Sequence, residues 1–144
     1  MTGLALIVLS CAGMGLSAAA ALRREERGLR LTMRILGRME TLILHRLLPL
    51  PRVMDMLAAE YPEAVSGTEG APWRERTVGR EGSALLTELT QTLRSGGDPE
   101  QSFAWICAEA KRRLSLAEER SRTGCRLYAG GGLLAGLLLA VLLW

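Results

Sequence analysis

Long apolar segments occupy both ends of the chain, and the charged residues are confined between them. Residues 3–22 read GLALIVLSCAGMGLSAAAAL, and residues 127–144 read LYAGGGLLAGLLLAVLLW. At about 1.5 Å per residue, each segment would form a helix about as long as the ~30 Å hydrocarbon core of a bilayer is thick. The pattern therefore predicts an N-terminal transmembrane helix over residues 1–22 and a C-terminal one over residues 127–144.

The middle of the chain, residues 23–126, shows the three- and four-residue spacing of apolar positions that is typical of amphipathic helices. The first of these helices should end at Pro49, and a corner over Pro49–Pro51 should lead into a shorter helix that ends near Tyr61. The apolar stripe of the first helix is expected on Leu29, Met33, Leu36, Met39, Ile43 and Leu47. No segment alternates as a strand would, so we predict an all-α fold, an antiparallel helical bundle flanked by the two transmembrane helices.

The second half of the middle begins with its least periodic stretch. Glycine and proline are frequent over residues 63–82, which we predict to be a loose loop that Trp73 attaches to the bundle. Ser83 should then cap a third helix that ends at Gly96 and Gly97. The order Asp98-Pro99-Glu100-Gln101 predicts a new helix, with Asp98 as N-cap and Gln101 completing a capping box.

The distribution of charge strengthens the membrane prediction. All 18 Lys and Arg residues and all 15 Asp and Glu residues lie between Arg23 and Arg126, and a charge at the bilayer centre costs roughly 2.5–3.5 kcal/mol on insertion scales. Arginines flank both apolar segments on the inner side, so the positive-inside rule predicts a two-pass protein of the cell membrane with residues 23–126 in the cytoplasm. Two alternatives remain open: a cleaved signal peptide that exports a soluble protein, and a lipoprotein signal at Cys11.

The sequence offers no constellation for chemistry. His45 is the only histidine, and the chain contains no GxxxxGK[ST] phosphate loop. The three cysteines lack the spacing of a zinc site or a disulfide framework. The net charge of +3 arises from interleaved basic and acidic residues, which is not typical of a nucleic-acid-binding surface. We therefore predict a protein without catalytic residues, cofactor or metal, which is not an enzyme and does not bind nucleic acid.

Interaction residues are expected in two places. Gly132 and Gly136 form a GxxxG motif, which allows close helix packing in a membrane, either with the small residues of the first segment or with another subunit, including a second copy of this chain. In the middle region, the candidate partner contacts are Glu40, Leu50, Asp98 and Gln101.

Four features together resemble the stage III sporulation protein AB family. They are the two apolar ends, Met39–Ile43 followed by Leu48-Pro49-Leu50-Pro51, the stretch from Leu93 through Gly96-Gly97-Asp98 to Gln101, and the closing run of residues 127–144. The resemblance implies a non-enzymatic scaffold in a channel-like complex between mother cell and forespore, similar to the inner-membrane platform protein of type II secretion and type IV pilus systems. It also implies the cytoplasmic ATPase, stage III sporulation protein AA, and other membrane subunits as partners, and a location on the mother-cell side, in the outer forespore membrane. A small two-span pore or holin-like protein is the alternative function.

Overall fold

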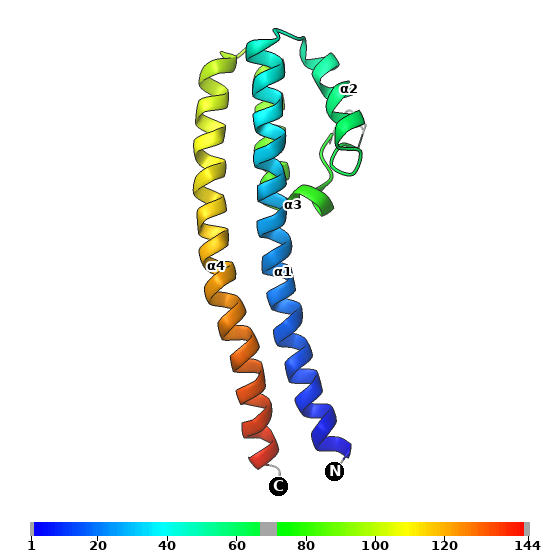
Figure 1. Ribbon diagram of the computed structural model, residues 1–144, viewed down its shortest axis with the longest axis vertical. Helices are drawn as coiled ribbons and strands as arrows, with labels where there is room; N and C mark the ends of the chain where they lie inside the picture. The colour runs from blue at the N-terminus through cyan, green and yellow to red at the C-terminus, as the bar shows by residue number, and fades with distance from the viewer. Residues whose placement is uncertain (1, 67–71, 143–144) are drawn as a thin grey trace. The chain divides into compact units, whose positions relative to one another are not determined.

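The computed structural model describes residues 2–66 and 72–142, and their regular structure is helical (Figure 1). Helix α1 spans Thr2–Glu40 and continues as a short π-helix, η1, over Thr41–His45. Helices α2, α3 and α4 follow at Leu50–Glu60, Glu75–Arg94 and Pro99–Leu142. Within these described residues the chain forms four α-helices and no strand, with one isolated β-bridge between Val65 and Trp73, which confirms the all-α prediction.

Contacts within the chain divide it into two compact units. The central unit comprises residues 27–115, and the terminal unit comprises the described parts of residues 1–26 and 116–144. Helices α1 and α4 each contribute residues to both units.

The core of the central unit is built from all four helices, which alternate in direction as an up-down-up-down bundle (Figure 1). The predicted apolar stripe of α1 supplies Leu36 and Met39 to this core, and Ile35 and Leu42 are buried beside them. The other fully buried members that are large are Val53, Leu57, Leu85, Leu86, Leu89, Phe103 and Ile106. Because these side chains recur at helical spacing on every element, burial of this shared face stabilises the four helices together.

The predicted loose loop over residues 63–82 is wrong for its second half, because α3 already begins at Glu75. Trp73 is buried, and its indole Nε1 donates a hydrogen bond to Thr90 Oγ1 at 3.3 Å, so it attaches the connection to the bundle as predicted. Within residues 63–82, residues 67–71 lie outside the described residues.

The start of α3 differs from the prediction that Ser83 caps it, since Ser83 lies inside the helix. Glu75 in the first turn suits the positive end of the helix dipole. One turn later the backbone kinks at Gly79, which has φ 79° and ψ 164°, a conformation open essentially to glycine alone. Gly82 is buried next to Thr32 of α1, where a Cβ atom would collide with the threonine hydroxyl. Two of the glycines that suggested a loop, Gly79 and Gly82, therefore form a kink and a close helix contact.

The terminal unit is an antiparallel pair of helices held together by small residues. A Cβ atom at Gly15 of α1 would lie 2.5 Å from the carbonyl oxygen of Tyr128, and one at Gly132 would lie 3.1 Å from that of Cys11. Further along, the Cys125 thiol approaches the Ala19 carbonyl oxygen at 3.9 Å. The backbones of α1 and α4 can approach this closely only because side chains are missing between them.

Large apolar side chains of the terminal unit point outward instead. Among the described residues, all but two of the exposed large apolar side chains of the chain belong to this unit, including Leu9, Leu16, Leu134 and Leu138. Over residues 2–66 and 72–142, no helix contains a stretch long and apolar enough to cross a membrane. The predicted spans over residues 1–22 and 127–144 thus stay predictions, and Trp144 lies outside the described residues.

Replacement by alanine should change the free energy of unfolding in opposite directions at two glycines of α1. A Cβ atom at Gly28 would lie 2.6 Å from the carbonyl oxygen of Val78, whereas one at Gly37 would have nothing within 4 Å. We expect Gly37→Ala to raise the free energy of unfolding by about 0.5–1 kcal/mol through helix propensity, and Gly28→Ala to lower it by about 1–3 kcal/mol through overpacking. Urea titration followed by circular dichroism measures both, and equal effects would contradict this packing.

A second pair tests the terminal unit. Gly15→Ala should force α1 and α4 apart and lower the thermal midpoint in detergent micelles, because its new methyl group meets the Tyr128 carbonyl group. Gly13 lies about half a turn away, and a Cβ atom there would have nothing within 4 Å. Gly13→Ala is therefore the matched control and should leave the midpoint unchanged or slightly higher. A lower midpoint for both variants would show that the effect is not specific to the helix contact.

Candidate partner-binding surface

The corner between α1 and α2 is made by a break in helical hydrogen bonding and by two prolines. Helix α1 does not continue to Pro49 as predicted but ends at Glu40, and the wider π-helical turn η1 follows. The N–H groups of Arg46 and Leu48 then bond to the carbonyl groups of Thr41 and Leu42 at 3.2 Å each. Pro49 is extended, with ψ 146°, and its carbonyl group accepts the first hydrogen bonds of α2 from Arg52 and Val53. The corner is therefore rigid.

Leu47, at the centre of this corner, does not join the core as predicted. Its side chain is 83% exposed, and its φ of 51° places it in the left-handed region, which costs an L-residue roughly 1–2 kcal/mol. This departure from the predicted apolar stripe begins at η1. A π-helical turn changes the spacing of side chains and so moves Leu47 off the face that carries Leu29 and Leu36. A leucine that is both strained and exposed does not stabilise the bundle, and such residues concentrate at functional sites.

The turn between α3 and α4 lies at the same end of the central unit as the proline corner (Figure 1). Gly96, with φ 80°, ends α3, and Asp98 begins α4 by accepting a hydrogen bond from the Glu100 N–H at 3.1 Å on its Oδ1 atom. Asp98 is thus the N-cap that the sequence predicted. Gln101, the other half of the predicted capping box, has an exposed side chain.

An aromatic side chain stands on the outer face of α4. Trp105 is 55% exposed, whereas Phe103 and Ile106 on either side of it point into the core. At 100° per residue, Gln101, Ala108 and Arg112 fall on the same face as Trp105, and all of them are exposed. We call these four residues the Trp105 face. Exposed tryptophan and arginine in such a setting are typical of residues that dominate binding energy in interfaces.

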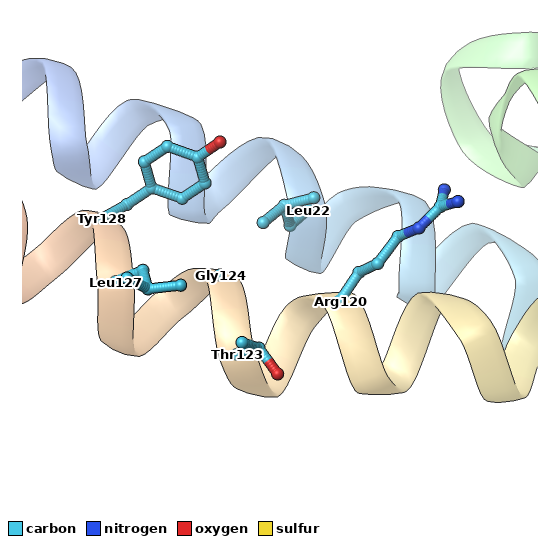
Figure 2. Close-up of a pocket in the computed structure, with 6 residues that line it drawn as sticks. All are labelled: Leu22, Arg120, Thr123, Gly124, Leu127 and Tyr128. Atoms are coloured by element: carbon cyan, nitrogen blue, oxygen red, sulfur yellow. The ribbon is translucent and has the colours of Figure 1, made fainter.

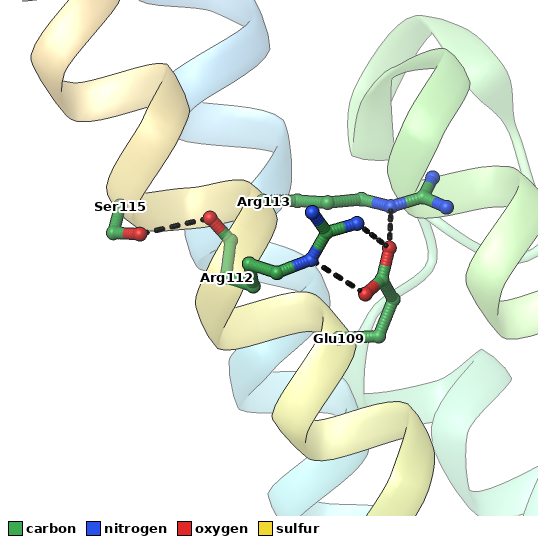
Figure 3. Close-up of polar contacts among 4 residues, drawn as sticks. All are labelled: Glu109, Arg112, Arg113 and Ser115. Carbon is green, nitrogen blue, oxygen red and sulfur yellow. Dashed lines mark hydrogen bonds and ion pairs between the residues drawn. The ribbon is translucent and has the colours of Figure 1, made fainter.

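Charged hydrogen bonds hold Arg112, the last residue of the Trp105 face along the chain, in place (Figure 3). The Glu109 carboxylate accepts hydrogen bonds from Arg112 Nε and Nη2 at 2.9 Å each and from Arg113 Nε at 2.8 Å. These bonds lower the pKa of Glu109 to about 2, with the largest contribution from Arg112 and the next largest from Arg113. The cluster therefore stays ionised at neutral pH and holds the Arg112 side chain in one position on the surface.

Glu40 lies on the side of α1 that faces α4. Burial raises the pKa of the Cys107 thiol, the charge of Glu40 raises it further, and Lys111 acts in the opposite direction. The Cys107 thiol is thus kept in its neutral form. A neighbouring ion pair between Arg38 Nε and Glu60 Oε2, at 2.9 Å, joins α1 to the end of α2.

The four predicted contact residues have different surroundings. Asp98 and Gln101 lie one to two turns before Trp105 on α4, whereas Leu50 begins α2 at the corner and packs against the core. Glu40 is half-buried and turned toward α4. The structure places Gly132 against α1 and buries Gly136, both in the terminal unit. Sequence reasoning missed Leu47 and Trp105, although the off-stripe position of Trp105 among the apolar residues of α4 was visible.

No arrangement for metal binding is found in the described residues, since they contain no group of three or more His, Cys, Asp or Glu side chains that could hold an ion. The fold and surface thus define a small all-helical protein with a four-helix central unit and a pair of helices at its ends.

The chain belongs to the stage III sporulation protein AB family. The model of this family matches residues 1–71, which include α1, the proline corner and α2. Membership assigns the protein a role in stage III of sporulation, and the family is not a known family of enzymes. The match ends before α3, so the Gly96-Gly97-Asp98 segment and the closing apolar run lie outside it. No curated protein and no solved structure matches the chain.

Leu47 can be tested apart from any partner. Asparagine tolerates the left-handed region better than leucine does, so Leu47→Asn should raise the free energy of unfolding by about 1 kcal/mol in urea titrations. Leu48→Asn is the neighbouring control: Leu48 packs against the core, and its replacement should destabilise the protein by about 1–3 kcal/mol. A loss of stability in Leu47→Asn would mean that the leucine packs in solution and is not a free contact residue.

Proposed function

We propose that this protein is a membrane-anchored, non-enzymatic scaffold of a secretion-like channel complex between mother cell and forespore, in which it docks the cytoplasmic ATPase, stage III sporulation protein AA. Membership of the stage III sporulation protein AB family supports the biological setting. The observation that carries the proposal is the reversed polarity of the terminal unit, where glycine and alanine lie inside and leucine lies outside.

The reversed polarity of the terminal unit supports anchoring. In water, a helix pair buries its large apolar side chains, because their removal from solvent drives packing. In lipid this drive is absent, and helices instead associate through small residues while leucines face the acyl chains. Gly15 and Gly132 at the contact, with Leu16 and Leu133 exposed, follow the second pattern. We therefore place residues 1–22 and 127–144 in the membrane as two spans.

The arginines next to these segments support the orientation. Arg23 and Arg24 follow the first segment, and Arg122 and Arg126 precede the second, while residues 1–22 and 127–144 contain no charged side chain. The positive-inside rule then leaves the central unit in the cytoplasm, which is the mother-cell side if the protein lies in the outer forespore membrane.

The Trp105 face supports docking. It belongs to the cytoplasmic part of the proposed topology, and it joins a large exposed aromatic side chain to an arginine that Glu109 holds in place. Burying such an indole in a pocket of a partner removes apolar surface from water, and a fixed arginine can pair with a carboxylate there. We propose that this face, with Gln101 and Asp98 toward the N-terminus of α4, receives the ATPase.

The experiment uses full-length protein in membrane vesicles that are washed at alkaline pH and then incubated with the purified ATPase. We expect the protein to stay with the vesicles and to bind the ATPase, and we expect Trp105→Ala to weaken binding at least tenfold. Trp105→Phe, which keeps a large aromatic side chain, should retain most of the affinity. Gln91→Ala, an exposed change on α3, is the surface control.

The outcomes separate the two parts of the proposal. Release of the protein by the alkaline wash would contradict anchoring. Stable anchoring with equal ATPase binding by wild type and Trp105→Ala would contradict docking at the Trp105 face. No binding of the ATPase by correctly folded, anchored wild type would contradict the docking function altogether.

A further inference from the structure

An open groove runs between α1 and α4 of the terminal unit. It has a volume of about 580 Å³ and is lined by Leu22 of α1 and by Arg120, Thr123, Gly124, Leu127 and Tyr128 of α4. Leu22 lies between Tyr128 and Arg120 (Figure 2). A Cβ atom at Gly124 would lie 2.6 Å from Leu22 Cδ1, so Gly124 leaves the floor of the groove open to this leucine. The groove thus has a cationic end and an apolar end.

A second groove continues from the apolar end. It shares Leu127 and Tyr128 with the first, has a volume of about 360 Å³, and reaches Gly131 and Ala135 of α4. Gly124, Leu127, Gly131 and Ala135 follow one another at three- and four-residue steps, so they form one stripe along the helix. At about 1.5 Å per residue the stripe is about 16 Å long, close to half of the ~30 Å hydrocarbon core. The two grooves together therefore have the depth of one leaflet.

The cationic end belongs to a band of arginines at one level of the terminal unit. Because Leu22 meets Gly124, Arg23 and Arg24 of α1 lie near the level of Arg120 and Arg122 of α4. Counted from the apolar segment on each helix, the arginines come first and the acidic residues follow. Glu25 and Glu26 lie beyond Arg23 and Arg24 on α1, and Glu118 and Glu119 lie beyond Arg120 and Arg122 on α4. An adjoining hollow of about 710 Å³ is lined by Arg122, Thr123, Arg126 and Leu127. The positive charge therefore lies at the border of the apolar surface.

We propose that these grooves bind an anionic phospholipid. The phosphate lies against the Arg120 guanidinium group at the cationic end of the first groove, and an acyl chain follows Leu127, Gly131 and Ala135. A guanidinium group donates two parallel hydrogen bonds, which phosphate oxygens accept. The apolar stripe replaces the hydrocarbon contacts that the acyl chain of the lipid makes in the bilayer. A free phosphate would fill only the cationic end, so the paired grooves favour the lipid. This inference rests on the proposed membrane location of the terminal unit.

The test reconstitutes full-length protein into vesicles of equal parts phosphatidylglycerol and phosphatidylcholine. After flotation, the protein is extracted in mild detergent, and the lipids that remain bound are quantified by mass spectrometry. We expect wild type to retain phosphatidylglycerol in preference to phosphatidylcholine, and Arg120→Gln to reduce that preference about tenfold. Arg94→Gln removes the same charge from an exposed position at the end of α3 and should leave the preference unchanged.

A second variant blocks only the apolar groove. A Cβ atom at Gly131 would have nothing within 4 Å, so Gly131→Leu can place its side chain there without disturbing the helix pair. It should reduce lipid retention while Arg120 is intact, and excess inorganic phosphate should not displace the lipid from wild type. Displacement by phosphate, with no effect of Gly131→Leu, would identify a simple phosphate site and overturn the lipid assignment.

The remaining outcomes are decisive in different ways. If the protein floats but retains both lipids equally, or if Arg120→Gln and Arg94→Gln behave alike, the lipid site is wrong and the membrane location stands. If wild type does not float with the vesicles, the membrane location is wrong and the lipid site is wrong with it.

Discussion

Helix α1 depends on close backbone approach at glycines in both units of the protein. In the terminal unit Gly15 faces the Tyr128 carbonyl group, and in the central unit Gly28 faces that of Val78. Each glycine costs helical stability relative to alanine, by about 1 kcal/mol. The close approach offsets this cost, because it brings the Thr32 hydroxyl group to 3.5 Å from the Val78 carbonyl oxygen, to which it donates, and lets the neighbouring apolar side chains of α1 reach the core.

Periodicity predicted those parts of the fold in which every turn of a helix faces the same environment. The stripe from Leu29 to Met39, the buried leucines of α3 and the Asp98 cap were visible in the sequence, because each depends on residues within one or two turns of one another. The helical character of residues 75–82 was not visible, because Gly79 and Gly82 have a loop-like composition. Gly79 is required by a kink in the helix, and Gly82 by its contact with Thr32, which is about fifty residues away in the chain.

The candidate surface was harder to predict for the same physical reason. Leu47 continues the apolar spacing of α1, and only the π-helical turn at Thr41–His45, a departure from regular helical hydrogen bonding, shows why it faces solvent. Trp105 is a large apolar residue, but it projects from α4 in a different direction around the helix axis than Phe103 and Ile106 do. The three side chains therefore cannot all face one core. Sequence therefore indicated Asp98 and Gln101 at the start of this face and missed the side chain that gives it most of its apolar area.

The same two helices follow opposite packing rules in the two units, and this opposition is the strongest physical reason for the proposal that the units lie in different solvents. In the central unit α1 and α4 bury Leu36, Met39 and Phe103 and expose charged residues, as water requires. In the terminal unit they bury Gly15 and Ala19 and expose leucines. One solvent does not favour both arrangements. Water favours the burial of large apolar side chains, whereas lipid does not. In the proposed topology the arginines at the border have a consistent place. They are the last charged residues before the apolar surface on either helix, where a cationic side chain would meet anionic headgroups and stay hydrated.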